Sequence, residues 1–216
     1  MTTENKADCV IVGGGIGGAV LALALVRHGL HSVLLERELT PPGHARPEIL
    51  AQSTVETFER RGAGERIKKE AAMPLQSLEL HRSGNGIVLH MAHEDFMRSG
   101  VQPYTTDPAR TRAILLETAE THGSVEVHRG VEVQDVLREN GRIAGVTAKR
   151  GQEALIWRAP LVVGDDGGKS KIRSAMGISL TTRELPVDFM AAVGPALPGH
   201  REAVGEAWVN LGEIRD

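Results

Sequence analysis

Glycines near the N-terminus have the spacing of a phosphate-binding turn. Gly13, Gly15 and Gly18 stand at G-x-G-x-x-G spacing, directly after an apolar Val-Ile-Val run. The first glycine permits a tight turn, the second lets a pyrophosphate approach the backbone, and the third lets the next helix pack closely on the sheet. The first helical turn, with Ile16 and Gly17, offers free N–H groups and the positive end of a helix dipole. The pattern predicts a dinucleotide site.

An acidic residue follows where the ribose of a dinucleotide would lie. The apolar run Ser32–Leu35 reads as a second strand, and Glu36 stands at its end, 18 residues after Gly18. A carboxylate there can accept hydrogen bonds from a ribose diol and would repel a 2′-phosphate. The alternative is a glycine-rich turn that binds nothing. The ordered series of strand, glycines, helix, strand and acid favours the binding site.

Bulk properties exclude several other classes of protein. The net charge of the 216 residues is −3, the pI is about 6.3 and aromatic residues make up 3%, so nothing indicates nucleic-acid binding. The N-terminus lacks the apolar region of a signal peptide, and the longest apolar run, 19–26, is too short to span a bilayer. The single cysteine, Cys9, fits a reducing compartment and reads as a buried apolar residue. We expect a soluble, cytoplasmic protein without a membrane span.

Helices and strands that would position these residues can be read along the chain. The run 19–27 is typical of a buried helix that Gly29 ends, and the proline-bearing segment 40–47 reads as a loop. Apolar spacing predicts a helix over 48–61, and Asp107-Pro108 predicts a helix that runs to about 122. Two alternating runs, 78–81 and 87–90, flank a Ser-Gly-Asn-Gly turn and predict a hairpin.

Repeated alternation over 125–163 indicates a small antiparallel β meander that returns to the parent sheet through 161–163. Strand candidates at 189–193 and 206–209 follow near the C-terminus. The fold class is therefore α/β: a Rossmann-like βαβ fold with an antiparallel meander and part of a β substrate-binding layer. We expect a discontinuous nucleotide-binding domain over 1–73 and 104–179, and a partial substrate-binding sheet over 74–103 and 180–216.

A second motif stands at the end of the return strand. Asp166 and Gly167 are followed by Ser170 and Arg173. This segment resembles the second fingerprint of FAD-dependent aromatic hydroxylases of the p-hydroxybenzoate hydroxylase type. In that family Asp-Gly contributes to binding FAD and the nicotinamide cofactor, and the usual form is Gly-Ala-Asp-Gly. Here Asp165 replaces the alanine. Taken alone, Asp-Gly is equally typical of a turn that caps a helix.

The resemblance extends along nearly the whole chain. Glu36-Arg37 resembles the family's ribose-binding acid and the arginine beside the adenine, and an arginine can stack on adenine through its planar guanidinium. Arg46 resembles the arginine that approaches the flavin, and Arg112 resembles the one on the helix beside the ribityl-phosphate arm. Val131 resembles the residue whose backbone reads adenine. For Arg112, the other reading is a solvated helical charge.

The resemblance implies an FAD-dependent monooxygenase that uses NADH or NADPH and O₂ to hydroxylate an aromatic or polycyclic small molecule. The oxygen chemistry belongs to the cofactor, so no catalytic side chain is identified. Two histidines near an acid, His90, His93 and Glu94, lack the spacing of a metal site, and no metal is expected. Gly168-Lys169-Ser170 is not a P-loop, because the position that needs the first glycine is Val163.

The family's Gly-Asp-Ala motif, which binds the flavin ribitol, has no match after Arg173. We therefore expect the chain to be an incomplete enzyme, with the rest supplied by a C-terminal half or by another copy of the chain. Two alternatives stay open. One is a related FAD oxidoreductase, such as a halogenase or a prenyl reductase. The other is a non-catalytic nucleotide-binding fragment.

Overall fold

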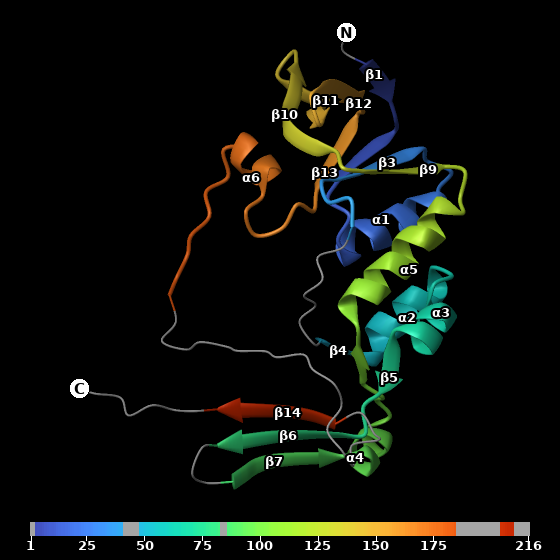
Figure 1. Cartoon of the computed structure of the whole chain (residues 1–216), viewed down its shortest axis with the longest axis vertical. Helices are drawn as coiled ribbons and strands as arrows, with labels where there is room; N and C mark the ends of the chain where they lie inside the picture. Colours follow the sequence, from blue (N-terminus) through green and yellow to red (C-terminus); the bar gives the residue numbers. More distant parts are fainter. Residues whose placement is uncertain (1–2, 41–47, 83–85, 185–203, 210–216) are drawn as a thin grey trace, which may run out of the picture. The chain divides into compact units, whose positions relative to one another are not determined.

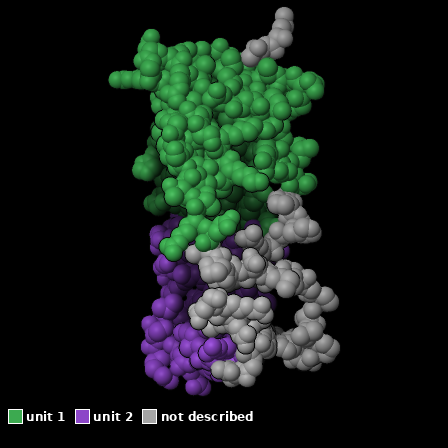
Figure 2. Space-filling model, turned by 90° about the vertical axis from the view of Figure 1, so that its left-hand side faces the viewer, with its two compact units in different colours: residues 1–44, 61–63, 109–189 green, residues 45–60, 64–108, 190–216 purple. Residues whose placement is uncertain are grey.

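The computed structural model describes residues 3–40, 48–82, 86–184 and the backbone of 204–209 (Figure 1). The chain divides into two compact units, which Figure 2 shows in different colours. Unit 1 contains residues 1–44, 61–63 and 109–189, and unit 2 contains 45–60, 64–108 and 190–216.

A four-stranded parallel sheet lies at the centre of unit 1. Its order is β13-β2-β3-β9, with strands β2 Cys9–Val12, β3 Ser32–Glu36, β9 Val125–Arg129 and β13 Leu161–Gly164. Every residue of β2 and β3 is buried, as their continuous apolar runs predict for central parallel strands. The strand order brings the ends of β13, β2 and β3 to one edge of the sheet. The nucleotide turn and the second motif begin at that edge.

Helices α1, Ile16–Val26, and α5, Pro108–Glu120, lie beside this sheet (Figure 1). The helix α1 follows β2 after the glycine turn and buries Ala19, Ala22 and Leu23. Small residues on this face allow the close approach that the third glycine of the motif also serves. The short helix α6, Lys171–Ala175, follows β13.

A second sheet in unit 1 has the order β1-β12-β11-β10. Its strands are β1 Thr3–Lys6, β10 Glu132–Glu139, β11 Arg142–Arg150 and β12 Glu153–Arg158. The meander prediction is therefore correct for 132–158. It is wrong for 125–129, because β9 pairs in parallel with β3 in the first sheet. The sequence pattern also did not predict β1, which pairs in parallel with β12. Trp157, Val146 and Val131 join both sheets in one core.

Unit 2 begins with small elements around a three-stranded sheet, β4-β8-β5. The elements are β4 Glu48–Leu50, α2 Gln52–Arg60, α3 Gly64–Glu70, β5 Ala72–Pro74 and β8 Tyr104–Thr106. The predicted helix over 48–61 thus starts four residues late, because Glu48–Leu50 pairs with β8 as a strand. Val55 and Phe58 form the buried face of α2.

The other sheet of unit 2 has the order β14-β6-β7. It consists of β6 Ser77–Arg82, β7 Gly86–Ala92 and β14 Val204–Val209, and α4, His93–Ser99, follows β7. Strands β6 and β7 are antiparallel, as the hairpin prediction requires, and β14 pairs in parallel with β6. The strand candidate at 189–193 and most of the loop at 40–47 lie outside the described residues.

The compact units group residues 45–60 and 64–73 with unit 2, whereas the expected nucleotide-binding domain included them. The boundaries of functional domains stay a prediction. None of the helices in the described ranges is long and apolar enough to cross a membrane.

Candidate functional site

The glycine turn between β2 and α1 is shaped by close backbone contacts. Gly13 has φ +110°, and a Cβ there would lie 2.2 Å from the carbonyl oxygen of Asp165. A Cβ on Gly18 would lie 2.1 Å from the carbonyl oxygen of Gly13. Both distances are shorter than any tolerated carbon–oxygen contact, so these two positions require glycine. The geometry fits the first and third glycines of the motif.

The N-terminus of α1 offers backbone donors beside this turn. Gly15 is the N-cap residue and has no side chain to cap the helix. Among the described residues, none accepts a hydrogen bond from the N–H of Ile16 or Gly17. The N–H of Gly18 donates to Oδ2 of Asp165 at 2.7 Å. Two free donors at the positive end of a helix dipole suit a phosphate.

The carboxylate of Glu36 is held at the end of β3 by three donors. Oε2 accepts from the N–H of Gly14 at 2.9 Å and from Nη2 of Arg112 at 2.6 Å, and Oε1 accepts from the N–H of Glu38 at 2.8 Å. The Glu36 side chain is 11% exposed. A carboxylate has about four acceptor positions, so it retains capacity for a further donor.

Arg112 of α5 joins the turn to this acid. Its Nε donates to the carbonyl oxygen of Gly14 at 2.5 Å while its Nη2 pairs with Glu36. The side chain is 13% exposed, so the solvated helical charge is not what the structure has. Sequence reasoning named Glu36 and Arg112 separately. It missed their ion pair and the role of Gly14, which bonds to both side chains. A Cβ on Gly14 would lie 2.9 Å from Oε2 of Glu36.

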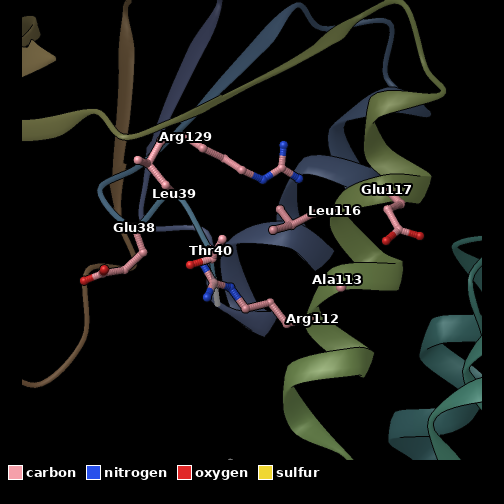
Figure 3. Close-up of a pocket in the computed structure, with 8 residues that line it drawn as sticks. All are labelled: Glu38, Leu39, Thr40, Arg112, Ala113, Leu116, Glu117 and Arg129. Carbon is pink, nitrogen blue, oxygen red and sulfur yellow. The ribbon is translucent and has the colours of Figure 1, made fainter. Parts of the chain in front are cut away.

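A pocket of about 190 Å³ lies beside this network, between the segment after β3, helix α5 and the end of β9 (Figure 3). Ala113 and Leu116 supply its apolar part, and Arg129 reaches across from β9 toward α5. The full lining is Glu38, Leu39, Thr40, Arg112, Ala113, Leu116, Glu117 and Arg129. The pocket is partly apolar, and Arg112 joins its lining to the network around Glu36.

The other residues assigned to the adenosine end have varied positions. The N–H of Val131 donates to the carbonyl oxygen of Glu36 at 2.9 Å, so this N–H is not available to a ligand. Nε of Arg37 donates to Glu38 at 3.0 Å, and its side chain is 71% exposed. Arg46 lies outside the described residues. The ligand roles of all three stay predictions.

The second motif caps helix α6. Asp166 accepts from the hydroxyl of Ser170 at 2.5 Å and from the N–H groups of Lys171 and Ile172 at 2.6 and 3.2 Å. Gly167 has φ +81°, which favours glycine in this turn. The capping interpretation is therefore correct as a structural role, and a cofactor role for Asp166 and Gly167 stays a prediction.

An ion-pair cluster fastens this loop to the meander. Lys171 Nζ lies 2.6 Å from Oε1 of Glu132, and Lys149 Nζ lies 3.1 Å from Oε2. The two ammonium groups, Lys171 foremost, lower the pKa of Glu132 to about 2. Glu132 is therefore ionised at physiological pH, and its exposed ion pairs connect α6 with β10 and β11.

Asp165 is the site residue that sequence reasoning missed. Its replacement of the usual alanine was visible, but its contact was not. The signal would have been strand adjacency: Gly164 of β13 pairs with Val12 of β2, so the next residue of each strand meets its neighbour. The N–H of Asp165 donates to the carbonyl oxygen of Val12 at 2.7 Å and fixes this arrangement.

Neither metal nor thiol chemistry has a visible site in the part of the chain that the structure describes. There, no three His, Cys, Asp or Glu residues are grouped as metal ligands. Cys9 is 1% exposed, and burial, with a smaller contribution from Asp8, raises the pKa of its thiol. A buried, protonated thiol is a poor nucleophile.

Comparison with known proteins shows which family shares this sequence. The family described as FAD binding domain matches residues 6–210. The chain is 28% identical to 6-methylpretetramide 4-monooxygenase of Streptomyces rimosus over 82% of this chain and 42% of that protein. It is 30% identical to 3-hydroxybenzoate 6-hydroxylase of Klebsiella oxytoca over 77% of this chain and 42% of that protein.

A solved structure of a PqsL variant from P. aeruginosa is similar, with a TM-score of 0.71 and 25% identity over 84% of this chain and 49% of that one. The chain spans less than half the length of these proteins. The family match covers the glycine turn, the buried acid and the second motif in a single stretch. The chain therefore belongs to the FAD binding domain family.

Proposed function

We propose that this chain supplies the ADP-binding part of an FAD-dependent monooxygenase that hydroxylates a small aromatic molecule with NADH or NADPH and O₂. The observation that carries the proposal is the network of Gly14, Glu36 and Arg112 beside the free N–H groups of α1. The buried carboxylate and the free backbone N–H groups lie at one edge of a parallel sheet, which supports a nucleotide ligand there. This is the usual ligand site of an open α/β fold.

Each of these residues has a definite task toward the cofactor. The N–H groups of Ile16 and Gly17 would bind the pyrophosphate, and Glu36 would accept from a ribose hydroxyl with its remaining lone pair. Arg112 holds the acid and the turn in place before the ligand arrives. Arg37 and the carbonyl of Val131 would contact the adenine. Bound FAD supplies the redox chemistry of oxygen transfer.

The similarities to a 4-monooxygenase and a 6-hydroxylase support an aromatic substrate. An oxygen-labelling assay tests this reaction. The full-length enzyme that contains this ADP-binding part is incubated with FAD, NADH or NADPH and a panel of phenols and polycyclic aromatics under ¹⁸O₂. The proposal expects a product that carries one ¹⁸O atom on the ring.

A halide-dependent product or a reduced, unoxygenated product would support the related oxidoreductases instead. Binding of FAD without any flavin reduction by NADH or NADPH would favour a non-catalytic nucleotide-binding module. The choice between NADH and NADPH follows from which of them reduces the flavin faster.

A further inference from the structure

The cofactor end of α1 already faces an anion that belongs to the protein. Oδ2 of Asp165 accepts a hydrogen bond from the N–H of Gly18 at 2.7 Å. Asp165, which is distant in sequence, thus caps the N-terminus of α1. Cβ atoms built on Gly15 and Gly17 would lie 3.4 and 2.9 Å from its carboxylate oxygens. The carboxylate therefore lies along the same face of the helix start that the glycines leave open.

Two contacts hold the backbone of Asp165 beside the glycine turn. Asp165 follows β13, and its N–H donates to the carbonyl oxygen of Val12 at 2.7 Å. Its own carbonyl oxygen packs against Gly13 so closely that a Cβ there would lie 2.2 Å away. The side chain of the next residue, Asp166, points instead to the start of α6.

Two negative groups then share one helix N-terminus when a pyrophosphate binds. Either the carboxylate stays and repels the phosphate, or it leaves and Gly18 loses its acceptor. Both courses cost binding free energy, because like charges placed side by side in an interface are unfavourable. Asp165 is exposed, so water and salt screen part of this repulsion.

We infer that Asp165 weakens the binding of FAD by occupying the phosphate end of α1, and that it acts as an affinity-setting residue of this site. The inference rests on the proposed function, since it needs FAD at this turn. Asp165 also stabilises the ligand-free fold as the cap of α1. The same carboxylate therefore lowers the affinity for FAD and stabilises the ligand-free protein.

Two substitutions separate charge from capping. Asp165→Asn keeps an oxygen acceptor for Gly18 and removes the charge, whereas Asp165→Ala removes both. Asp8→Asn is the matched control, because Oδ2 of Asp8 also accepts a backbone N–H, that of His31 at 2.8 Å, at the start of β2 and away from the turn. Affinities are measured by quenching of FAD fluorescence.

The expected result is a dissociation constant for FAD about three- to tenfold lower in Asp165→Asn, and lower again in Asp165→Ala. The control stays within about twofold of wild type. The ratio of the wild-type to the variant dissociation constant for FAD falls toward one as the salt concentration is raised. For adenosine, which has no phosphate, the same ratio is close to one. The melting temperature of ligand-free Asp165→Ala falls by about 2–4 °C through loss of the cap.

Equal or weaker FAD binding by both Asp165 variants, with binding by wild type intact, would overturn the inference and leave the proposed function standing. An equal gain for adenosine would also overturn it, because the effect would then not depend on phosphate. Absence of FAD binding by wild type and all variants would contradict the proposed function, and the inference with it. Binding by the Asp165 variants alone would support the inference.

Discussion

Arg112 and Glu36 should be strongly coupled in the ligand-free fold: replacing both should lower the free energy of unfolding by less than the sum of the two single replacements. Both side chains are nearly nine-tenths buried, and Arg112 also donates to the carbonyl oxygen of Gly14. Arg112→Met keeps the length of the side chain but leaves the acid with two backbone donors and no cation. Removing one partner of a buried ion pair lowers the free energy of unfolding by about 3–5 kcal/mol, so we expect Arg112→Met to lower it by about 3 kcal/mol.

Glu36→Gln has the complementary effect, because it leaves a buried guanidinium beside a neutral amide. We expect it to cost about 2–3 kcal/mol. The double variant has no unpaired charge left, so its cost should fall short of the sum by at least about 1.5 kcal/mol. This shortfall is the coupling energy of the pair.

The assay is urea denaturation followed by the fluorescence of Trp157, which is 2% exposed in the core of unit 1. Trp208→Phe provides a background in which Trp157 is the one tryptophan, since the chain has two. The exposed pair Arg37–Glu38 of unit 1 is the control and should couple by less than about 0.5 kcal/mol. Additivity of Arg112→Met and Glu36→Gln within about 0.5 kcal/mol would refute the reasoning.

Three further outcomes are expected. Gly18→Ala should cost about 3 kcal/mol or more because its Cβ would overlap a carbonyl oxygen, whereas Gly123→Ala, with open space around it, should stay within about 0.5 kcal/mol in the same denaturation assay. Cys9 should resist iodoacetamide in the native state and react after unfolding, and rapid native labelling would contradict its burial. A hydrogen bond from His128, and a second from another histidine, lower the pKa of Glu126, so its contribution to stability is present at neutral pH and is lost as the pH falls through that lowered pKa. Glu126→Gln should therefore lose slightly more stability, below about 0.5 kcal/mol, at neutral pH than in acid, and an equal difference at all pH values would argue against the assignment.

Local signals in the sequence predicted the nucleotide turn well. Gly13 and Gly18 are needed for backbone reasons that their spacing already implies. The end of β3 at Glu36 follows from a short apolar run that closes in an acid. Asp107-Pro108 marks the start of α5 because a cap residue and an N1 proline act within one turn of helix.

Several long-range strand partners could not be predicted from such local signals. The run 125–129 alternates like its neighbours, but it pairs in parallel with β3, and a period of two says nothing about which strand lies alongside. Glu48–Leu50 has apolar spacing that fits a helix, and its pairing with β8 decides for a strand. The short strand β1 likewise depends on β12, about 150 positions away in the chain.

The candidate site shows the same division. Glu36 and Arg112 were identified one by one, while their ion pair depends on how α5 lies against the turn. Asp165 stood out as a departure from the usual alanine, but its contact with Gly18 joins residues that are 147 positions apart in the chain. Long-range contacts of this kind follow from strand order, which the sequence pattern does not contain.

The most direct test of FAD binding at this turn is a titration of the chain with FAD, followed by displacement with ADP. Under the proposed function the glycine turn and Glu36 bind the ADP half of FAD, so ADP should displace FAD competitively. A 2′-phosphorylated analogue of ADP should fail to do so, since the buried carboxylate of Glu36 repels the added phosphate. Binding of FAD that ADP does not affect, or displacement by the 2′-phosphorylated analogue as readily as by ADP, would contradict this assignment of the site.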